Sequence, residues 1–344
     1  MPWVAHAEHA IAIMCRALVD ERRMMASTVR RNRAAWEAAR RHYEDDQSME
    51  VITGELGVSR STVSRLLQHA RDLGLVEVRV ASSPDEIAPL ERRLAERWGI
   101  RATVVAPQAG GDDEKTLGEV AGAAARVIGD ALAGESVVGV AWGSTMDAVS
   151  RRLPGRVIPG CTIVQLNGAG NFHTSGVPYA SELLRRFGES FGARIEQFPV
   201  PAFFDSASTR EAYWRERSTR RILALHARLD CAVFGIGSPF SHTPGHVYQG
   251  GYLEQPDYAQ LRAERVVGDI ATVFYRADGS SSGIPLNDRA SGPSFAILRR
   301  ARRRVCVASG PGKVLALRGA LTAGVVTDLV VDRELAMATL QAAR

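Results

Sequence analysis

The sequence is poor in cysteine, with four in 344 residues: Cys15, Cys161, Cys231 and Cys306. They lie far apart, and no two have the short spacing of a zinc site or a redox pair. This pattern excludes a disulfide framework and gives no sign of a bound metal or another cofactor. We therefore expect a protein of the reducing cytoplasm that folds around an ordinary apolar core.

Long apolar runs are also missing. Residues 1–27 form an N-terminal extension whose apolar stretch, HAIAIMCRALV, is too short and too interrupted to cross a bilayer. The extension lacks the basic start and small-residue cleavage site of a signal peptide. It is either an extra helix for contacts between subunits or an irregular start, and no membrane partner is expected.

Lysine is nearly absent, since 41 of the 43 Lys and Arg residues are arginine and only Lys115 and Lys313 are lysine. The net charge is +5 although the pI is near 9.3, so the protein is not a generally basic coat for nucleic acid. Affinity for DNA would have to come from a local patch presented in two copies. Each retained lysine becomes a candidate functional residue.

Residues 53–80 carry the pattern of a helix-turn-helix motif. Gly57 separates two short helical segments, and Ser59 is placed to cap the second by accepting a hydrogen bond from its first-turn amides. Four apolar residues then recur at helical spacing and form one face for packing: Val63, Leu66, Leu67 and Ala70.

The opposite face of this second segment is polar and basic. Such side chains suit phosphates and base edges in a major groove, with Arg matched to guanine and Gln to adenine. The predicted DNA-binding residues are Ser59, Arg60, Ser61, Thr62, Ser64, Arg65, Gln68 and Arg71. No carboxylate lies between Ser59 and Arg71, so three arginines are unopposed along the segment. The alternative is an ordinary amphipathic helix with a solvated face, but the turn, the cap and the polar face together favour double-stranded DNA.

The flanks of the motif complete a DNA-binding domain at residues 28–82. Thr28–Tyr43 is expected to be its first helix, and Leu75–Val80 alternates as a wing or exit strand would. The expected inward positions of the first helix are Val29, Trp36, Ala39 and Tyr43. Pro84 and Pro89 bracket a linker at residues 83–90.

The remaining segment, residues 91–344, has the pattern of an α/β domain that begins with a helix at Glu91–Trp98. Short Val/Ile/Ala runs predict buried strands at Ala102–Ala106, Val137–Trp142, Thr162–Asn167, Cys231–Gly235, Val305–Ala308 and Leu329–Val331. Stretches of helical length lie at Glu114–Leu132, Tyr179–Phe187 and Lys313–Ala323. This order predicts a doubly wound, Rossmann-like parallel sheet covered on both faces. Asp269–Asp278 alternates more and is either a hairpin or an inserted subdomain.

Four predicted strand-to-helix loops contain glycine, and three of them also carry hydroxyl groups: Trp142–Met146, Asn167–Asn171, Gly235–Pro239 and Ser309–Lys313. Ligands of doubly wound sheets bind at such loops, and amides at helix starts favour an anion such as phosphate. The last loop is not a Walker A motif, because Val307 and Val314 replace the required Gly and hydroxyl. A dinucleotide fingerprint also fails, because His173 occupies the place of its third Gly. The sequence therefore favours a smaller phosphorylated molecule over ATP or NAD.

The polar residues expected to line this pocket are Ser144, Thr145, Asn167, Asp205, Asp269 and Lys313. Structural alternatives remain for three of them. Asp205 is as well placed to cap a helix at Ser206–Trp214, and Asp269 to end a turn after Gly268. Lys313 stands in a first helical turn, where a cation is unfavourable unless an anion neutralises it.

Other clusters indicate less. His242 and His246 have no third ligand at metal-site spacing, so a plain loop is expected there. The arginine-rich run at Leu298–Val305 is compatible with DNA, a partner subunit or solvent, with solvent as the default. No Ser/His/Asp arrangement or paired-carboxylate motif is present, so an enzyme is not the leading expectation.

The chain resembles the SorC family of bacterial sugar-binding transcriptional regulators over residues 28–342. The matching segments, in order, are GVSRSTVSRLL at 57–67, GVAWGSTM at 139–146, VQLNGAG at 164–170, PAFFDS at 201–206, FGIGSP at 234–239, GDI at 268–270 and ASGPGKVLALRGALTAGVVTDLVVD at 308–332. The resemblance implies an effector domain similar to sugar-phosphate isomerases, a phosphorylated sugar or polyol as effector, and homo-oligomers, dimers or tetramers, on palindromic operators. It also implies effector contacts in these loops. The effector-binding residues expected from the loops and the resemblance together are Gly143, Ser144, Thr145, Met146, Asn167, Asp205, Asp269, Gly310 and Lys313.

The leading hypothesis is an effector-responsive regulator of a carbohydrate or polyol operon. Its alternative is a sugar-phosphate isomerase or deaminase with a helical appendage, in which Asp205 or Asp269 would be the base. A purely architectural DNA-binding protein does not explain the glycine-containing loops.

Overall fold

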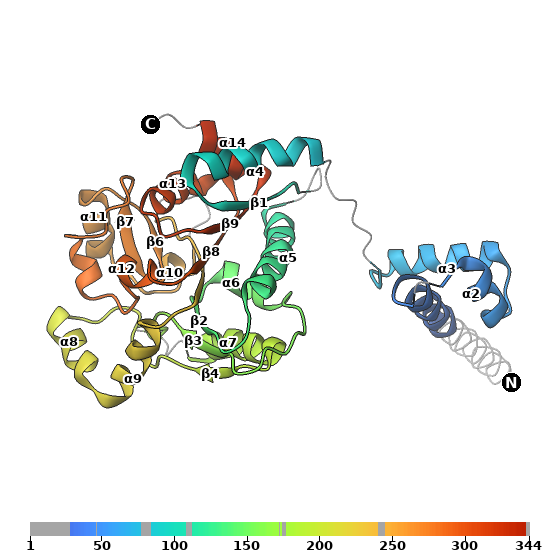
Figure 1. Ribbon diagram of the computed structural model, residues 1–344, viewed down its shortest axis with the longest axis horizontal. Helices are drawn as coiled ribbons and strands as arrows, with labels where there is room; N and C mark the ends of the chain where they lie inside the picture. The colour runs from blue at the N-terminus through green and yellow to red at the C-terminus, as the bar shows by residue number, and fades with distance from the viewer. Residues whose placement is uncertain are drawn as a thin grey trace, which may run out of the picture. The chain divides into compact units, whose positions relative to one another are not determined.

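The computed structural model describes residues 28–45, 47–76, 84–107, 112–171, 173, 177–239 and 245–341. The chain forms two compact units, residues 1–81 and 82–344, and each is described by itself (Figure 1).

The smaller unit contains a helix over residues 28–43, followed by α2 (Met49–Leu56) and α3 (Arg60–Asp72). Gly57 ends α2 at φ 64°, a left-handed conformation that glycine adopts without strain. Ser59 caps α3, accepting a hydrogen bond from the amide of Thr62 at 3.2 Å. The core of this unit consists of Ala35, Ala38, Ala39, Ile52, Val63, Leu67 and Ala70.

Three of the four predicted inward positions of the first helix are wrong. Val29, Trp36 and Tyr43 are 67%, 49% and 43% exposed, and only Ala39 is buried. The helix packs through Ala35, Ala38 and Ala39, whose small side chains permit close approach of its neighbours. The three large residues lie on a stripe turned roughly 100° away, given 100° per residue. The predicted exit strand lies largely outside the described residues.

The larger unit is built on a seven-stranded sheet in which every pairing is parallel. The strands are β1 (Arg101–Val105), β2 (Val137–Val140), β3 (Thr162–Gln165), β4 (Arg194–Glu196), β5 (Cys231–Gly235), β8 (Arg303–Ala308) and β9 (Asp328–Asp332). Their order is β1-β9-β8-β5-β2-β3-β4. Each predicted strand is present within a few residues, and only the three-residue edge strand β4 was not predicted.

The order of the strands creates a topological switch point. From β2 the chain moves outward through β3 to β4, and it then returns to the other side of β2 to form β5. The loops that follow β2 and β5 therefore run in opposite directions and leave a crevice between them.

Helices cover both faces of the sheet, as a doubly wound fold requires. The helices are α4 (Pro84–Trp98), α5 (Asp113–Ala131), α6 (Ser144–Ser150), α7 (Val177–Phe191), α8 (Ala207–Arg215), α9 (Arg217–His226), α10 (His246–Gln249), α11 (Gln255–Ala263), α12 (Phe295–Leu298), α13 (Val314–Thr322) and α14 (Arg333–Gln341). Short 3-10 helices lie at Pro285–Asp288 and Pro311–Lys313.

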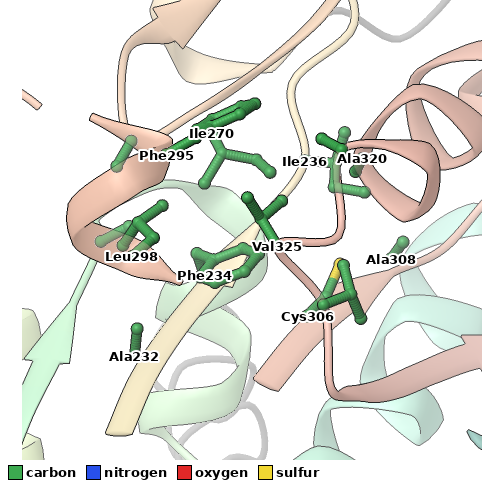
Figure 2. Close-up of a cluster of buried hydrophobic side chains, with 14 of the residues drawn as sticks. Ala232, Phe234, Ile236, Ile270, Phe295, Leu298, Cys306, Ala308, Ala320 and Val325 are labelled. Atoms are coloured by element: carbon green, nitrogen blue, oxygen red, sulfur yellow. The ribbon is translucent and has the colours of Figure 1, made fainter. Parts of the chain in front are cut away.

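Side chains alternate between the two faces along each strand. On β5, Ala232 and Phe234 enter the core beneath α4, α9, α13 and α14, whereas Cys231 and Val233 enter the core beneath α5, α6 and α7. Figure 2 shows part of the first core, where Phe234 packs among residues of β8, α12 and the loop after α13. Two separate apolar cores therefore fix the sheet and the ends of its strands.

Residues 84–90, predicted to belong to the linker, are helical. Helix α4 begins at Pro84 and continues through Pro89. Pro84 stands at the first position of the helix, where the amide has no intrahelical partner, whereas Pro89 lies inside the helix and removes one intrahelical hydrogen bond. Ile87, Leu90 and Leu94 follow at helical spacing and pack on the first core, and this burial holds the helix together.

A two-stranded hairpin of β6 (Val266–Ile270) and β7 (Val273–Arg276) lies beside the sheet. The alternation of residues 269–278 is therefore that of a hairpin. Ala271 and Thr272 form its turn with φ of 48° and 66°, values usually left to Gly, Asn or Asp. The hairpin pairs with Gly237 through Asp269, which places a carboxylate at the switch point.

Candidate functional site

A cleft opens at the switch point, where six parts of the chain converge. Its volume is about 510 Å³, including the open solvent at its mouth. The residues that line it are Ala141–Met146 after β2, Asn167 after β3, Gly235–Gly237 after β5, Gly245–Tyr248 at α10, Asp269, Ala271 and Thr272 of the hairpin, and Lys313 after β8. Ligands of open parallel sheets bind in this position.

Aromatic rings form one wall of the cleft. The rings of Trp142 and Tyr252 stack with centroids 5.0 Å apart, and His246 stacks on Tyr179 at 4.8 Å and meets the edge of Trp142 at 5.7 Å. Burial lowers the pKa of His246, which favours its neutral form. Helix α10 is thus fixed over the cleft by ring contacts.

Asp269 is the acidic group of the cleft and is 4% exposed. Its Oδ1 accepts a hydrogen bond from the Tyr248 hydroxyl at 2.6 Å, and its Oδ2 accepts one from the Thr272 amide at 3.2 Å. Burial raises the pKa of Asp269 to about 6, against the opposing effect of these hydrogen bonds and of Lys313. Gly237 makes room for the carboxylate, because a Cβ there would lie 1.9 Å from Asp269 Oδ1.

Lys313 supplies the positive charge of the cleft. Burial lowers the pKa of its ammonium group, while the nearby Cys306, Asp332 and Asp269 oppose that effect. Among the described residues no hydrogen bond or ion pair engages this ammonium group. The amides of Ser144, Thr145 and Met146 are equally without intrahelical partners, as at every helix start. The cleft therefore offers unused donors to an anion.

Gly310, predicted as an effector contact, shapes the loop instead of lining the cleft. Its φ is 94°, and its amide donates to Asp332 Oδ2 at 2.7 Å. The other carboxylate oxygen of Asp332 accepts from the amide of Leu335 at 2.8 Å. Asp332 thereby ties the Lys313 loop to the start of α14.

Asp205 lies apart from the other predicted effector contacts. It is exposed and borders a separate hollow beside Phe203, Tyr213 and Tyr252. It does not cap α8 either, because Ser206 accepts the hydrogen bond from the amide of Thr209 at 3.1 Å. The sequence predicted Asp205 near the sheet, but its side chain borders this second hollow and not the switch-point cleft.

The other predicted effector residues meet in one cleft: Gly143, Ser144, Thr145, Met146, Asn167, Asp269 and Lys313. Met146 also belongs to the second core, so part of its role is packing. The sequence patterns missed Tyr248 and His246, which lie on α10 beyond the loop that directly follows β5, and Thr272, which lies in the turn of the hairpin. His246 had been interpreted as part of a plain loop, and its position among aromatic rings corrects that interpretation.

The predicted DNA-binding residues lie on the outer face of α3. Ser59, Arg60, Ser61, Ser64, Arg65, Gln68 and Arg71 are exposed, and Thr62 is half-buried. One correction concerns the charge, because Arg60 is paired with Glu50 of α2 at 2.9 Å and is not unopposed. Both side chains are largely exposed, so solvent screens the pair and leaves it weak.

Two absences hold for the described ranges. Within them, no three His, Cys, Asp or Glu side chains gather as a metal ion would require. No helix of the same residues has the length and apolar character of a membrane span.

Comparison with known proteins identifies relatives for both units. Residues 82–341 match the family described as "Putative sugar-binding domain". The chain is 30% identical over 302 residues to the deoxyribonucleoside regulator of Bacillus subtilis, across 88% of this chain and 95% of the relative.

Two solved structures are similar. One is a domain of a "possible sugar-binding transcriptional regulator" from Arthrobacter aurescens, with a TM-score of 0.71, 49% identity, and coverage of 76% of this chain and 100% of that one. The other is the full-length sorbitol operon regulator SorC from Klebsiella pneumoniae, with a TM-score of 0.79, 26% identity, and coverage of 90% and 98%. The match to the sorbitol operon regulator thus covers most of both units, and the chain belongs to the SorC family of sugar-binding transcriptional regulators.

Proposed function

We propose that the protein regulates transcription of a carbohydrate or polyol catabolic operon in response to a phosphorylated sugar or polyol. The observation that carries the effector class is Lys313, whose ammonium group lies in the cleft without a partner among the described residues. A phosphate would receive charge-assisted hydrogen bonds from Lys313 and from the amides at 144–146. Relatives named for sorbitol, erythritol and deoxyribonucleosides support the same class.

The DNA-binding part of the proposal concerns α3. Its exposed Ser, Arg and Gln side chains suit the major groove, and a single helix of this kind contacts only a half-site. A symmetric dimer or tetramer would present two copies to a palindromic operator. The effector regulates DNA binding only if it has different affinities for the DNA-competent and DNA-incompetent states.

Thermal shift with a panel of phosphorylated sugars and polyols tests the effector site. Wild type should be stabilised by the best ligand, by about 2.7 kcal/mol at a concentration of 100 Kd. Lys313→Ala should lower the affinity by a factor of about 10 to 100. The matched control is Lys115→Ala, since Lys115 is the other lysine and is exposed at the start of α5. An unchanged response of Lys313→Ala would contradict the assignment of the phosphate site.

One observation favours a second candidate, a sugar-phosphate isomerase or deaminase. Burial raises the pKa of Asp269 to about 6, close to the range of a general base. Turnover of the same panel separates the two functions. Stabilisation without turnover supports a sensor, whereas turnover that Asp269→Asn abolishes supports the enzyme.

A further inference from the structure

The side chain of Asn167 is an unpaired polar group inside the cleft. The residue is 1% exposed, and it lines the cleft at the end of β3. Its Oδ1 is buried and accepts no hydrogen bond within the part of the chain that the structure describes. Asp269, by contrast, already bonds to Tyr248 and Thr272.

The backbone around Asn167 is firmly held, so the unpaired side chain does not reflect a loose loop. The Asn167 carbonyl accepts hydrogen bonds from Trp142 Nε1 at 3.1 Å and from Gln165 Nε2 at 2.8 Å. The amide of Gly168 donates to Ser291 Oγ at 2.9 Å. Gly168 is also required sterically, because a Cβ there would lie 2.1 Å from the carbonyl oxygen of Val200. The carboxamide is therefore presented in a fixed place.

An unpaired buried carboxamide costs free energy of folding, which a suitable ligand group recovers on binding. A carboxamide is neutral and offers both donors and acceptors. A hydroxyl group satisfies it in either orientation, whereas a carboxylate or an ammonium group satisfies only one. Lys313 and the amides at 144–146 suit an anion, so the cleft has two kinds of unused group. A matching ligand carries an anion and a neutral hydroxyl.

We propose that Asn167 is a specificity-determining residue that reads a hydroxyl group of the effector. This inference rests on the proposed function, since it divides the effector into a phosphate near Lys313 and a hydroxyl at Asn167. Analogues that lack that hydroxyl bind less tightly, because they leave the buried carboxamide unpaired in the complex.

Isothermal titration calorimetry of the full chain tests this inference. The probes are D-ribose 5-phosphate, D-glucose 6-phosphate, the monodeoxy analogues of each, and inorganic phosphate. Wild type should prefer a hydroxylated probe to one of its deoxy analogues by about tenfold or more. Asn167→Ala should bring that ratio within about twofold and leave the affinity for inorganic phosphate unchanged.

A matched control comes from Asn287, a second asparagine of the same unit. Its carboxamide is fully engaged, because Oδ1 accepts from the Phe274 amide at 2.8 Å and Nδ2 donates to the carbonyls of Phe274 and Ser281 at 2.9 and 2.8 Å. Asn287→Ala should lower the Tm and keep the preference for the hydroxylated probe, whereas Asn167→Ala should not lower the Tm and should lose that preference. In Asn167→Asp the side chain keeps nearly the same shape but gains a negative charge, so the affinity for every phosphorylated probe should fall.

The outcomes separate this inference from the proposed function. Phosphosugars that bind in a Lys313-dependent way, with a hydroxyl preference that Asn167→Ala retains, would overturn the role of Asn167 alone. Equal affinities of all deoxy analogues in wild type would do the same. If none of the probes, inorganic phosphate included, binds wild type, the proposed function fails and this inference fails with it.

Discussion

The outer face of α3 and the switch-point cleft use similar side chains in opposite settings. On α3, Ser, Thr and Arg side chains come from one helix and are mostly exposed. In the cleft, Asn167, Asp269 and Lys313 come from three distant segments of the chain and face a largely buried space. The first surface follows from one local pattern, whereas the second exists only when the whole sheet is assembled.

The difference leads to different sensitivities. A change on α3 alters one contact and leaves the scaffold intact. A change beneath the cleft alters the scaffold that holds the contacts. The following substitutions test this contrast, beginning with the largest expected effect.

Alanine in place of glycine should have opposite effects in the two regions. In Gly168→Ala the new Cβ meets the backbone oxygens of Val200 and Pro201 at 2.1 and 2.4 Å, so we expect a loss of roughly 3–5 kcal/mol. In Gly54→Ala the Cβ in α2 meets nothing within 4 Å, and we expect a gain of about 0.5–1 kcal/mol. Denaturant unfolding of the two variants measures both. Equal changes in the free energy of unfolding for the two variants would contradict the expected difference between the two regions.

The buried His226 should make the stability of the larger unit depend on pH. Its Nε2 lies 2.9 Å from the carbonyl oxygen of Gln165, and burial lowers its pKa to about 4. The folded protein favours the neutral form of His226. The contribution of this residue to stability is therefore complete above about pH 6.5, the pKa of histidine in the unfolded chain, and is lost as the pH falls toward 4. We expect wild type to lose about 3 kcal/mol from this group between pH 7 and pH 4.

The matched variant for this measurement is His226→Gln, which keeps a donor for Gln165 and does not titrate. Asp269 changes stability with pH in the opposite direction, because its raised pKa stabilises the fold at a pH below about 6. This contribution of Asp269 is the same in wild type and in the variant. The difference between their denaturation midpoints therefore isolates His226. Parallel pH profiles of wild type and variant would refute the assignment.

Arg65→Ala tests the exposed face. Arg65 is exposed on α3, and among the described residues it bonds only to the carbonyl of Ser61, at 3.3 Å, so it is available to DNA. We expect operator affinity to fall by 1–3 kcal/mol, with thermal stability nearly unchanged. Fluorescence anisotropy with the upstream intergenic DNA measures the affinity. Arg185→Ala, on α7 of the larger unit, serves as the arginine control, and unchanged binding of Arg65→Ala would refute the DNA-binding face.

The smallest effect concerns two equivalent caps. Ser59 accepts from the Thr62 amide and contacts the Ser61 and Thr62 hydroxyls, and Ser206 makes the same contacts with Thr209 and Ser208. Ser59→Ala should cost about 1 kcal/mol of stability in the smaller unit. Ser206→Ala should cost less, because no residue of α8 is buried and that helix can fray locally. Hydrogen exchange of the two first turns distinguishes the cases.

Much of the fold followed from local patterns. The six longer strands of the sheet were predicted because each is a short apolar run between helices, and α3 because its cap, turn and apolar face coincide. Strand β4 escaped prediction because Arg194, Ile195 and Glu196 form no apolar run. The linker was predicted at residues 83–90 because Pro89 was expected to prevent a helix there. The helix forms nevertheless, because the burial of Leu94 and its neighbours outweighs the one hydrogen bond that Pro89 removes.

The candidate site was less predictable. The loops after β2, β3 and β8 were found because they contain glycine and directly follow a strand, but Tyr248 reaches Asp269 from α10, beyond the loop that directly follows β5. Asp205 borders a different hollow although it follows a family motif. Both results depend on how distant segments pack, which local composition does not encode.

The turn at Ala271 and Thr272 has a consequence for evolution and engineering. Two residues with side chains occupy left-handed backbone conformations there, each at a cost of about 1–2 kcal/mol relative to glycine. Selection for stability alone would place glycine at both positions. Glycine at position 272 would keep the backbone amide that bonds to Asp269, but it would let the turn adopt more conformations and hold that amide less firmly. Variants chosen for heat resistance should therefore tend to acquire glycine at this turn and lose sensitivity to the effector, whereas variants chosen for regulation should retain the strain.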